Sequence, residues 1–532
     1  MPTELSAALP RAFNLAEYFL DRPAREHPDR IAILGEPTAV RYSELAALAN
    51  RAGNALGASG CQAGERVLIA LPDSAEFMAT FFGSTKIGAV AVPVNSASRV
   101  ADYGCYVADS GARIAVVHAS ALTEFLPATE GTAVELVVLV GGLAGAAERS
   151  ALGVRFVDWD DWIRAASGTL DPHPTSATDT AFFLFTSGSG GKPKAAIHQH
   201  KDMLVTSRSF AHSVLGLRAE DRTFSVSKLF FAYGLGNGMY FPFFAGASTV
   251  LNPERPRADK VIEMVARYRP TVFFSVPTFY AALLREAERA AADFSSVRLA
   301  VSAGELLPPE IFAQFKKRFD LEILDGIGST EMLHMFLSNR PGEARPGSCG
   351  VEVPSYEAKI VDDGGEPAPT GEIGNLWVKG ESAFAGYWKQ PELTARARRG
   401  DWVVTGDKFF RDADGYYHYC GRADDMMKVA GMWVSPGEVE NALLGHPLVA
   451  EAAVVGALDE VGLTRPVAYV VLRGGTSGHA ELAREIQGFV RTRLASYKCP
   501  QEIRFQDELP KTATGKIQRF RLRAPERGAA PG

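Results

Sequence analysis

Hydrophobic positions in the first 120 residues alternate between helical spacing and short apolar runs. Leucines and alanines recur at helical intervals over 43–57, which predicts a helix with Ser43 as its N-cap. The apolar run 66–71 predicts a strand. The same alternation continues with helices near 74–85 and 99–109 and strands over 89–94 and 114–118. Such alternation predicts a buried parallel sheet covered by helices.

A second alternating block follows the glycine-rich stretch near residue 190. Its candidate strands are 249–251, 271–275, 299–302 and 322–324. Two doubly wound sheets are therefore expected. From 347 to 419 the pattern changes to short strands between turns such as Asp363-Gly364-Gly365, which predicts a small antiparallel β-barrel or sheet.

A separate unit is predicted after Arg422. Ser435 and Pro436 are typical of an N-cap and a first helical residue, and the helix is expected to run to about Leu444. Two strands and a helix near 480–494 follow, giving an α+β unit of about 110 residues. The expected fold class is α/β, with a large N-terminal domain of two doubly wound sheets plus a small β-barrel, and a smaller α+β C-terminal domain.

Charge and cysteine content restrict the classes of partner. The chain has 532 residues and a formal net charge of −6, with no long basic run before its last twenty residues, so neither nucleic acid nor a membrane is expected as a partner. Five cysteines without CxxC or Cys/His spacing argue against a disulfide framework or a structural zinc site. No apolar stretch reaches about 18 residues. We expect a soluble, unprocessed, cytoplasmic protein that acts on a small molecule.

One run of nine residues concentrates hydroxyls, glycines and lysines: Thr186, Ser187, Gly188, Ser189, Gly190, Gly191, Lys192, Pro193 and Lys194. Glycines let backbone N–H groups turn toward an anion, and Ser, Thr and Lys add donors and charge. The run therefore suits a polyphosphate clamp. It is not a Walker A loop, because Thr186 and Pro193 replace the glycine and hydroxyl of that motif, so magnesium would be held elsewhere. Taken alone, it is also typical of a solvated turn.

Five further segments accompany this run in a fixed order. They are SAGELLP at 302–308, DGIGSTE at 325–331, TGD at 405–407, GRADDMMK at 421–428 and PKTATGKIQR at 510–519. With them, nearly the whole chain resembles the adenylate-forming superfamily, which comprises acyl-CoA ligases, peptide-synthetase adenylation domains and luciferases. The run departs from the superfamily pattern at Gly190, where Thr is common, and at Ala195, where Gly is common.

This resemblance implies an ATP site. Glu331 is the implied magnesium ligand and Thr330 an implied catalytic donor to the α-phosphate, while Asp407 and Arg422 are implied at the ribose. The other implied ATP-binding residues are Thr186, Ser187, Gly188, Ser189, Gly191, Lys192, Ser302, Ala303, Gly304, Glu305, Asp325, Gly326 and Ile327. Plainer interpretations are a helix N-terminal carboxylate for Glu331, an ordinary ion pair for Asp407 and Arg422, and a strand-to-helix turn at 302–305.

The resemblance also implies a mobile catalytic domain of residues 424–532, joined near Asp424 to an N-terminal AMP-binding domain of residues 1–423. Lys516 corresponds to a catalytic lysine that would bridge the acid carboxylate and the α-phosphate. Rotation at the hinge would withdraw this lysine and present the CoA site. The implied hinge and CoA-site residues are Asp424, Lys428, Gly431, Met432 and Trp433. Plainer interpretations are an exposed tail lysine and a hairpin turn at Gly431.

Two segments are similar to benzoate-CoA ligases in particular, KLFFAYGLGN at 228–237 and MLHMFLSN at 332–339. His334, placed one helical turn beyond Glu331, is expected to orient the acid carboxylate. Met335 is expected to be a flexible pocket wall that admits ring substituents. The implied substrate-binding residues are Phe231, Ala232, Tyr233, Gly234, Gly328, His334 and Met335. A core histidine and a core tyrosine are the plainer interpretations of His334 and Tyr233.

The resemblance thus implies an aryl-carboxylate CoA ligase that uses ATP, Mg²⁺ and coenzyme A and releases AMP and pyrophosphate. Loading of the aryl group onto a carrier protein, another acyl-CoA synthetase activity, and a non-catalytic nucleotide-binding role stay open. Luciferase-like oxygenation is compatible with the scaffold, although no residue favours it. A homodimer and a lysine acetyltransferase acting on Lys516 are further expected partners.

Overall fold

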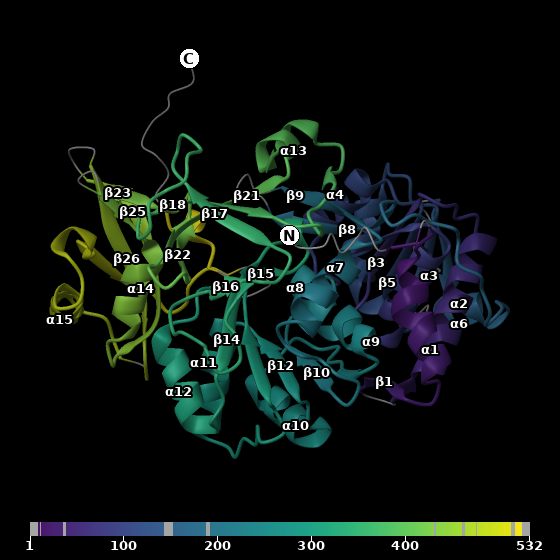
Figure 1. The fold of residues 1–532 in the computed structure, drawn as a ribbon, viewed down its shortest axis with the longest axis horizontal. Helices are drawn as coiled ribbons and strands as arrows, with labels where there is room; N and C mark the ends of the chain where they lie inside the picture. The colour runs from purple at the N-terminus through teal and green to yellow at the C-terminus, as the bar shows by residue number, and fades with distance from the viewer. Residues whose placement is uncertain are drawn as a thin grey trace.

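The structure is a computed structural model that describes residues 9–10, 12–35, 39–142, 153–187, 192–429, 432–459, 463–474, 476–511 and 517–523. Two large β-sheets with helices around them form the right and lower parts of Figure 1. A smaller unit built from residues after 435 lies at the left of the view, and a third sheet of short strands lies between the two parts.

The first sheet is buried on both faces. Its strands are β3 (Arg66–Ala70), β4 (Val90–Pro93), β5 (Ile114–His118), β6 (Leu136–Val140), β7 (Arg155–Asp158), β8 (Thr180–Ser187), β9 (Pro193–Gln199) and β19 (Gly386–Tyr387). They follow the order β19-β9-β8-β4-β3-β5-β6-β7, in which only β9 and β19 lie antiparallel to their neighbours. Along β3, Val67 and Ile69 face one hydrophobic core, and Leu68 and Ala70 face another, as expected for a parallel sheet between helices.

Helices α2 (Tyr42–Ala58) and α3 (Ala75–Lys86) cover one face of the first sheet, and α4 (Val100–Ser110) covers the other. Helix α2 begins at Tyr42 because the Glu44 carboxylate accepts a hydrogen bond from the Arg41 N–H (2.8 Å), which satisfies a free donor of the first turn. The N-cap is therefore Arg41, and the prediction of Ser43 is wrong by two residues.

The other helices before residue 400 are mostly short. They are α1 (Arg22–Glu26), α5 (Leu122–Phe125), α6 (Trp159–Arg164), α7 (Asp202–Thr206), α8 (Ala232–Leu235), α9 (Phe241–Ala245), α10 (Ala258–Tyr268), α11 (Pro277–Ala287), α12 (Pro309–Phe319) and α13 (Pro391–Ala397). Among the described residues, the π-helical segments η2 (Glu17–Asp21), η6 (Ser207–His212) and η7 (Gly236–Tyr240) extend or precede them.

The second sheet combines strands from distant parts of the chain. They are β1 (Ile31–Leu34), β2 (Val40–Arg41), β10 (Arg222–Ser225), β11 (Ser248–Val250), β12 (Val272–Ser275), β13 (Leu299–Ser302), β14 (Ile323–Gly328), β15 (Met335–Ser338) and β16 (Val351–Glu352). The order is β16-β15-β14-β13-β12-β10-β11-β1-β2, parallel from β14 to β1. Phe274 and Val301 face the layer between the two large sheets, whereas Phe273 and Ala300 face α10, α11 and α12.

The two doubly wound sheets are confirmed, but they are not two consecutive blocks of sequence. The predicted strands 114–118 and 299–302 coincide with β5 and β13. Strand β1, however, pairs with β11 through Ile33 and Thr249, so the N-terminal strand pair completes the second sheet. Contacts between segments this far apart leave no trace in local hydrophobic spacing.

The third sheet contains β17 (Glu357–Val361), β18 (Gly374–Lys379), β20 (Arg398–Arg399), β21 (Trp402–Arg411) and β22 (Tyr417–Arg422), all antiparallel. Of the two expected forms, a barrel or a sheet, the described residues form the sheet, and no closed ring of strands is found among them.

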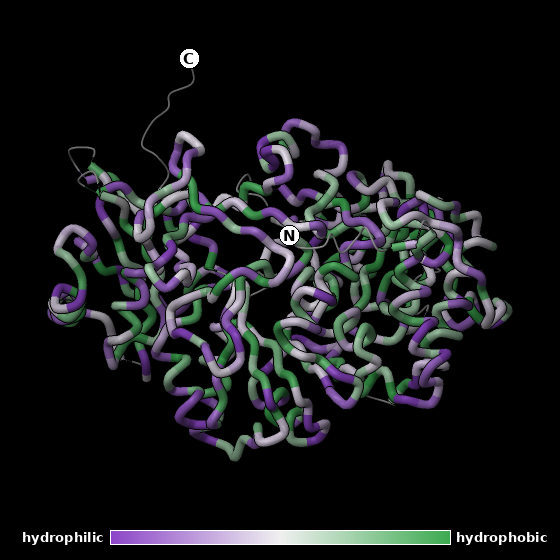
Figure 2. Tube along the Cα trace, in the orientation of Figure 1, coloured by the Kyte–Doolittle hydropathy of each residue, from purple (hydrophilic) through white to green (hydrophobic). Residues whose placement is uncertain are grey.

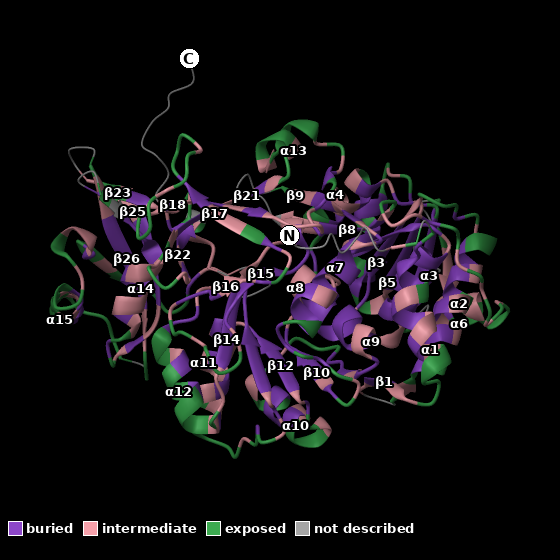
Figure 3. Ribbon diagram, viewed as in Figure 1, coloured by how far each residue is buried: buried purple, intermediate pink, exposed green. Residues whose placement is uncertain are grey.

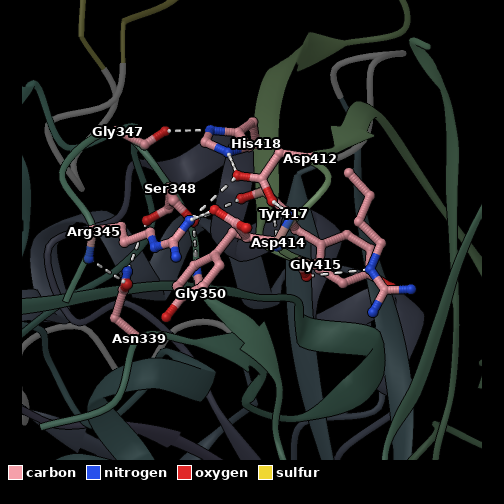
Figure 4. Close-up of polar contacts among 12 residues, drawn as sticks. Asn339, Arg345, Gly347, Ser348, Gly350, Asp412, Asp414, Gly415, Tyr417 and His418 are labelled. Carbon is pink, nitrogen blue, oxygen red and sulfur yellow. Dashed lines mark hydrogen bonds and ion pairs between the residues drawn. The ribbon is translucent and has the colours of Figure 1, made fainter. Parts of the chain in front are cut away.

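A polar network joins the third sheet to the end of the second (Figure 4). Asn339 Nδ2 donates to the Ser348 carbonyl (2.7 Å), and the Ser348 hydroxyl donates to the Tyr417 carbonyl (3.2 Å). Arg345 Nη1 lies 2.7 Å from the Asp414 carboxylate. The start of β22 is therefore fixed against the second sheet.

The small unit is built from β25 (Val449–Leu458), β26 (Thr464–Leu472), β27 (Glu502–Phe505), α14 (Pro436–Leu444) and α15 (Ala480–Arg491). A hairpin of β23 (Met427–Val429) and β24 (Met432–Val434) precedes it. Ser435 Oγ accepts a hydrogen bond from the Glu438 N–H (3.2 Å), and Pro436 is the first helical residue. The predicted start of this helix is confirmed.

Hydropathy and burial follow the same layers. In Figure 2 the hydrophobic stretches follow the strands of the large sheets, and in Figure 3 these strands are buried while α12 and α13 are largely exposed. None of the helices in the described part of the chain is long and apolar enough to cross a membrane.

Candidate active site

Three buried polar side chains stand in one row at the carboxyl ends of neighbouring parallel strands. Ser275 on β12 is the register partner of Ser302 on β13, which in turn pairs with Asp325 on β14. Each has a side-chain oxygen without a hydrogen-bond partner among the described residues. Burial raises the pKa of Asp325 to about 8, so this carboxyl is mostly protonated at neutral pH. Unpaired buried polar atoms at this edge of a parallel sheet are typical of a ligand site.

The segment after β13, predicted to bind ATP, leads from this strand toward α12. Ala303 is buried, and Gly304 has a φ of +90°, a conformation that favours glycine. The Glu305 carboxylate accepts hydrogen bonds from the N–H (3.2 Å) and the hydroxyl of Thr278 at the start of α11. Thr278, which fixes this turn to the neighbouring helix, was not predicted from the sequence.

Glycines after Asp325 allow β15 to lie against β14. A Cβ on Gly326 would lie 2.5 Å from the Leu337 carbonyl oxygen, and a Cβ on Gly328 would lie 2.4 Å from the His334 carbonyl oxygen. Ile327 lies between them on the same strand. The next residues form the 3₁₀ turn η8 (Thr330–Met332), so the predicted pair Thr330 and Glu331 lies at the carboxyl edge of the second sheet.

Glu331 is held by two residues from the first sheet. The Tyr387 hydroxyl donates to its carboxylate (2.5 Å), and Lys194 Nζ lies 3.8 Å from the same oxygen. Lys194 also donates to the Tyr387 hydroxyl (2.6 Å). Burial lowers the pKa of Lys194, and burial together with the Glu331 carboxylate raises the pKa of Tyr387. Lys194 was predicted only as part of the run, and Tyr387, which lies 56 positions beyond Glu331, was not predicted.

The glycine-rich run is the connection of the β8–β9 hairpin. Thr186 and Lys194 are register partners in that hairpin. Lys192 is exposed. Of the other predicted ATP-binding residues of the run, Gly188, Ser189 and Gly191 lie outside the described residues, as does the side chain of Ser187. The hairpin thus brings the run to the side of the Glu331 carboxylate through Lys194.

Asp407 on β21 and Arg422 on β22 are brought together as predicted. They are register partners, and Arg422 Nη1 donates to Asp407 Oδ1 (3.1 Å) and to the Thr405 carbonyl (2.8 Å). Gly406 has a φ of +75°, and a Cβ there would lie 2.9 Å from the guanidinium. The side chain of Asp407 is 10% exposed and that of Arg422 is 48% exposed, so the pair faces solvent through the arginine.

Tyr233 and His334 lie in a buried aromatic cluster. Their ring centroids are 5.5 Å apart, and the rings of Phe210 and Phe241 lie 5.3 and 4.5 Å from His334. The Tyr233 hydroxyl lies 3.4 Å from the Ser275 carbonyl. The aromatic cluster therefore borders the row of buried polar groups.

The predicted helical placement of His334 is wrong. The turn η8 ends at Met332, and Leu333, with a φ of +66°, redirects the chain into β15. His334 Nε2 lies 3.1 Å from Asn237 Oδ1, and its Nδ1 has no partner among the described residues. Burial lowers the pKa of His334 to about 3, so the ring is neutral at pH 7 and can form hydrogen bonds but not an ion pair.

The other predicted substrate residues lie on two segments. Phe231 precedes α8, which begins at Ala232. A Cβ on Gly234 would lie 2.0 Å from the Lys228 carbonyl oxygen, so only glycine fits there. Met335 is buried on β15. The structure thus brings Tyr233, His334 and Met335 to the edge of the second sheet, and it adds Asn237, a polar residue inside an apolar segment that could have been noticed in the sequence.

The predicted hinge and CoA residues lie before and within the β23–β24 hairpin. The Asp424 carbonyl accepts a hydrogen bond from Arg523 Nη2 (2.9 Å). Lys428 is exposed on β23, and Met432 is 53% exposed on β24. Gly431 and the side chain of Trp433 lie outside the described residues.

Lys516 also lies outside the described residues, but the chain on both sides of it is anchored to the small unit. Lys511 and Ile517 form an isolated antiparallel bridge. Lys511 Nζ lies 2.7 Å from the Glu451 carboxylate, and Arg519 Nη2 lies 2.7 Å from the Glu440 carboxylate. Both ends of the segment that carries the lysine are therefore fixed.

The donor set around Glu331 suits a magnesium ion held mainly by a substrate. No group of three or more His, Cys, Asp or Glu side chains among the described residues is placed to hold a metal ion. Mg²⁺ is commonly bound by one or two carboxylates together with substrate phosphates. Glu331 supplies one carboxylate, and its side chain is 17% exposed, so the residues present fit that mode.

Comparisons with known proteins cover nearly the whole chain. The family model for AMP-binding enzymes matches residues 20–388, and the model for the AMP-binding enzyme C-terminal domain matches residues 438–516. A benzoate–CoA ligase of Thauera aromatica is 41% identical over 520 residues, which cover 97% of each chain. A 3-hydroxybenzoate–CoA ligase of Aromatoleum sp. (strain CIB) is 40% identical over 518 residues, which cover 96% of this chain and 97% of the relative.

Solved structures give the same result. The anthranilate CoA ligase AuaEII in complex with anthranoyl-AMP has a TM-score of 0.92 and 40% identity, covering 97% of this chain and 98% of that one. A benzoate CoA ligase from Burkholderia xenovorans LB400 has a TM-score of 0.88 and 38% identity, covering 96% of this chain and all of the other. The predicted superfamily is confirmed, and the chain belongs to the AMP-binding enzyme family.

Proposed function

We propose that this protein is an AMP-forming ligase that joins benzoate or a small substituted benzoate to coenzyme A. One observation carries the proposal. Tyr233 borders both the aromatic cluster around His334 and the row of unpaired polar groups at Ser275, Ser302 and Asp325. A flat apolar ring and a nucleotide would therefore be bound side by side, as a ligase with an aryl-adenylate intermediate requires.

The reaction has two steps. In the first, a carboxylate oxygen of the acid forms a bond to the α-phosphorus of ATP, and the bond to the β-phosphate oxygen breaks to release pyrophosphate. In the second, the CoA sulfur bonds to the acyl carbon, its proton is lost, and AMP leaves. Both steps concentrate negative charge on phosphate oxygens, which fixed cations and donors stabilise.

The residues at the sheet edges supply these cations and donors. Glu331 would hold the magnesium ion, which lowers the charge on the phosphates when bound. Lys194 adds a cation beside that carboxylate, and the hydroxyl of Thr330 can donate to the α-phosphate. Asp407 can accept hydrogen bonds from ribose hydroxyls while Arg422 holds its carboxylate in place.

The acid would lie against Tyr233, His334 and Met335. The neutral imidazole of His334, held by Asn237, can form a hydrogen bond to the acid without carrying a charge itself. Relatives are named for benzoate, hydroxybenzoates and anthranilate, so we propose that ring substituents as small as hydroxyl or amino are accepted beside the flexible Met335. A difference of one methylene in such a pocket changes selectivity by only about 1–3 kcal/mol.

Residues 424–532 would act as a mobile domain, hinged near Asp424. In one orientation Lys516 would bridge the acid carboxylate and the α-phosphate, holding two mutually repelling anions together. In the other, the segment around Gly431 would border the entry path of the CoA thiol, where a side chain would obstruct it.

A substrate panel tests the proposal. Benzoates, cinnamates and short fatty acids are incubated with ATP, Mg²⁺ and either CoA or a holo carrier protein, and thioester and pyrophosphate are measured. We expect benzoates and CoA to give the highest kcat/KM. Preference for the carrier protein, or for fatty acids, would overturn the aryl-CoA assignment. Lys516→Ala is expected to abolish adenylate formation and to spare thioester formation from supplied benzoyl-adenylate.

A further inference from the structure

We propose that His198 and Ser382 are positioning residues that fix the backbone of η8. This turn carries Thr330 and Glu331, whose side chains face the substrates in the function proposed above. The inference rests on that function, but it concerns side chains that touch neither ATP nor the acid. It explains how the turn keeps one conformation before any ligand binds.

The three carbonyls of η8 accept hydrogen bonds from two other segments, β9 and residues 382–384. His198 Nε2 lies 2.8 Å from the Thr330 carbonyl, the Phe384 N–H donates to the Glu331 carbonyl (2.7 Å), and Ser382 Oγ donates to the Met332 carbonyl (2.8 Å). The Thr330 carbonyl also accepts the Leu333 N–H (3.1 Å), which closes the turn. A 3₁₀ turn leaves its last carbonyls, here those of Glu331 and Met332, without partners in the turn itself. Here all three are bound by donors from the first sheet and from the residues that lead into β19.

The turn needs such support because the residue after it is strained. Leu333 has φ +66° and ψ −37° and is fully buried. A branched side chain rarely adopts positive φ, and such conformations persist only where the surroundings enforce them. Without the donors, Leu333 would relax toward negative φ. That relaxation would move the preceding Thr330 and Glu331.

His198 is itself held rigidly. It lies on β9, fully buried, with its ring stacked on Phe182 (5.1 Å between centroids, 18° between planes). Its Nδ1 lies 3.0 Å from Asp202 Oδ2, which also accepts the Gln199 N–H (2.9 Å). Because a carbonyl oxygen can only accept, His198 Nε2 donates to the Thr330 carbonyl, while Nδ1 faces the Asp202 carboxylate. The Asp202 carboxylate therefore sets the orientation in which His198 reaches the Thr330 carbonyl.

Strand β9 contacts the turn twice. Lys194, four residues before His198 and on the same face of the strand, lies beside the Glu331 carboxylate. One strand thus holds both the backbone and the side chain of the turn. The same strand begins at Pro193, at the end of the glycine-rich run.

Ser382 supports the other end of the turn. It is fully buried, and its single hydroxyl proton is donated to the Met332 carbonyl. The Tyr356 hydroxyl, 2.7 Å from Ser382 Oγ, must then be the donor in that contact. Burial raises the pKa of Tyr356, so this donor keeps its proton across the physiological range.

The test separates positioning from general stabilisation. His198→Phe keeps a ring that can stack on Phe182 but removes the donor to Thr330, and Ser382→Ala removes the donor to Met332. His198→Gln restores an N–H donor on a side chain of similar reach. His200→Phe is the matched control, because His200 is equally buried but its ring accepts the Leu15 N–H, far from η8 in the chain.

Three measurements are made on each variant: benzoate-dependent ATP–pyrophosphate exchange, thioester formation from supplied benzoyl-adenylate, and the thermal midpoint. We expect His198→Phe and Ser382→Ala to lower exchange about 10- to 100-fold, because displacements near 1 Å have effects of that size. Thioester formation should change less than about threefold, and His198→Gln should recover part of the exchange. His200→Phe should change both half-reactions by the same factor.

Equal losses in both half-reactions for His198→Phe, or no loss in exchange, would overturn the inference. If His198→Phe does not fold, the same criteria apply to Ser382→Ala, which leaves β9 intact. A wild-type protein that forms no benzoyl-adenylate would instead contradict the proposed function, so the two failures are distinguishable.

Discussion

Because the Asp325 carboxyl is protonated in the folded protein, we expect that replacing this residue stabilises the protein instead of destabilising it. Asp325 lies buried at the carboxyl end of β14, and burial raises the pKa of its carboxyl to about 8. The folded protein therefore holds a proton that the unfolded chain releases near pH 4. Replacing Asp325 with Asn keeps the shape and a neutral side chain but removes the titration. We expect Asp325→Asn to stabilise the protein at neutral pH.

The magnitude follows from proton linkage. A folded pKa above the unfolded value lowers stability as pH rises from the unfolded pKa of 3.8 to the folded pKa of about 8. At pH 7 the penalty is roughly 4 kcal/mol, and near pH 5 it falls to roughly 1–2 kcal/mol. The difference in unfolding free energy between Asp325→Asn and wild type should therefore grow with pH and level off above pH 8.

Urea unfolding at pH 5, 7 and 9 measures this difference. Asp221→Asn is the matched control, because hydrogen bonds from Arg298 and Thr271 outweigh the effect of burial and lower the pKa of Asp221. Asp221→Asn should be less stable than wild type at pH 7, and its unfolding free energy should approach that of wild type only at acid pH. A difference for Asp325→Asn that stays constant from pH 5 to 9 would refute the reasoning.

Three further predictions concern single contacts. Arg422→Ala removes a charged donor, worth about 1.5–3 kcal/mol, and should weaken AMP binding about 10- to 100-fold by calorimetry; unchanged affinity would contradict a role at the nucleotide. Gly236→Ala places a Cβ 2.7 Å from the His334 ring and should raise KM for benzoate with little change in KM for ATP, measured by steady-state kinetics. Burial alone would raise the pKa of Asp412, but hydrogen bonds from His418 and backbone N–H groups outweigh it and lower that pKa. Asp412→Asn should therefore destabilise the protein at pH 7, and a urea titration should find the difference vanishing as pH falls below about 4.

Much of the fold was predictable where the hydrophobic pattern is local. Strand β5 coincides with the apolar run 114–118, and the Ser435-Pro436 helix start is as expected, because both depend on neighbouring residues. The pairing of β1 with β11 was not predictable, since a strand's partner is decided by long-range packing.

In the candidate site, too, some residues were predictable from the sequence and others depend on long-range packing. The resemblance named Glu331, Asp407 and Arg422, and the structure places Glu331 beside Lys194 and Asp407 against Arg422, while their roles at ATP stay predictions. Motif spacing misplaced His334, because a helix was extended through Leu333, whose positive φ ends the turn. Tyr387 could not be found, because its contact with Glu331 depends on β19 pairing with β9 across the sheet.

The pairing of β1 with β11 also has a consequence during synthesis. The ribosome releases β1 more than two hundred residues before its partner strand, and at about 5–20 residues per second that delay lasts tens of seconds. Throughout it, an apolar strand edge is open to wrong partners. Nascent chains that stall before residue 250 should therefore be aggregation-prone and dependent on chaperones, whatever the stability of the finished enzyme.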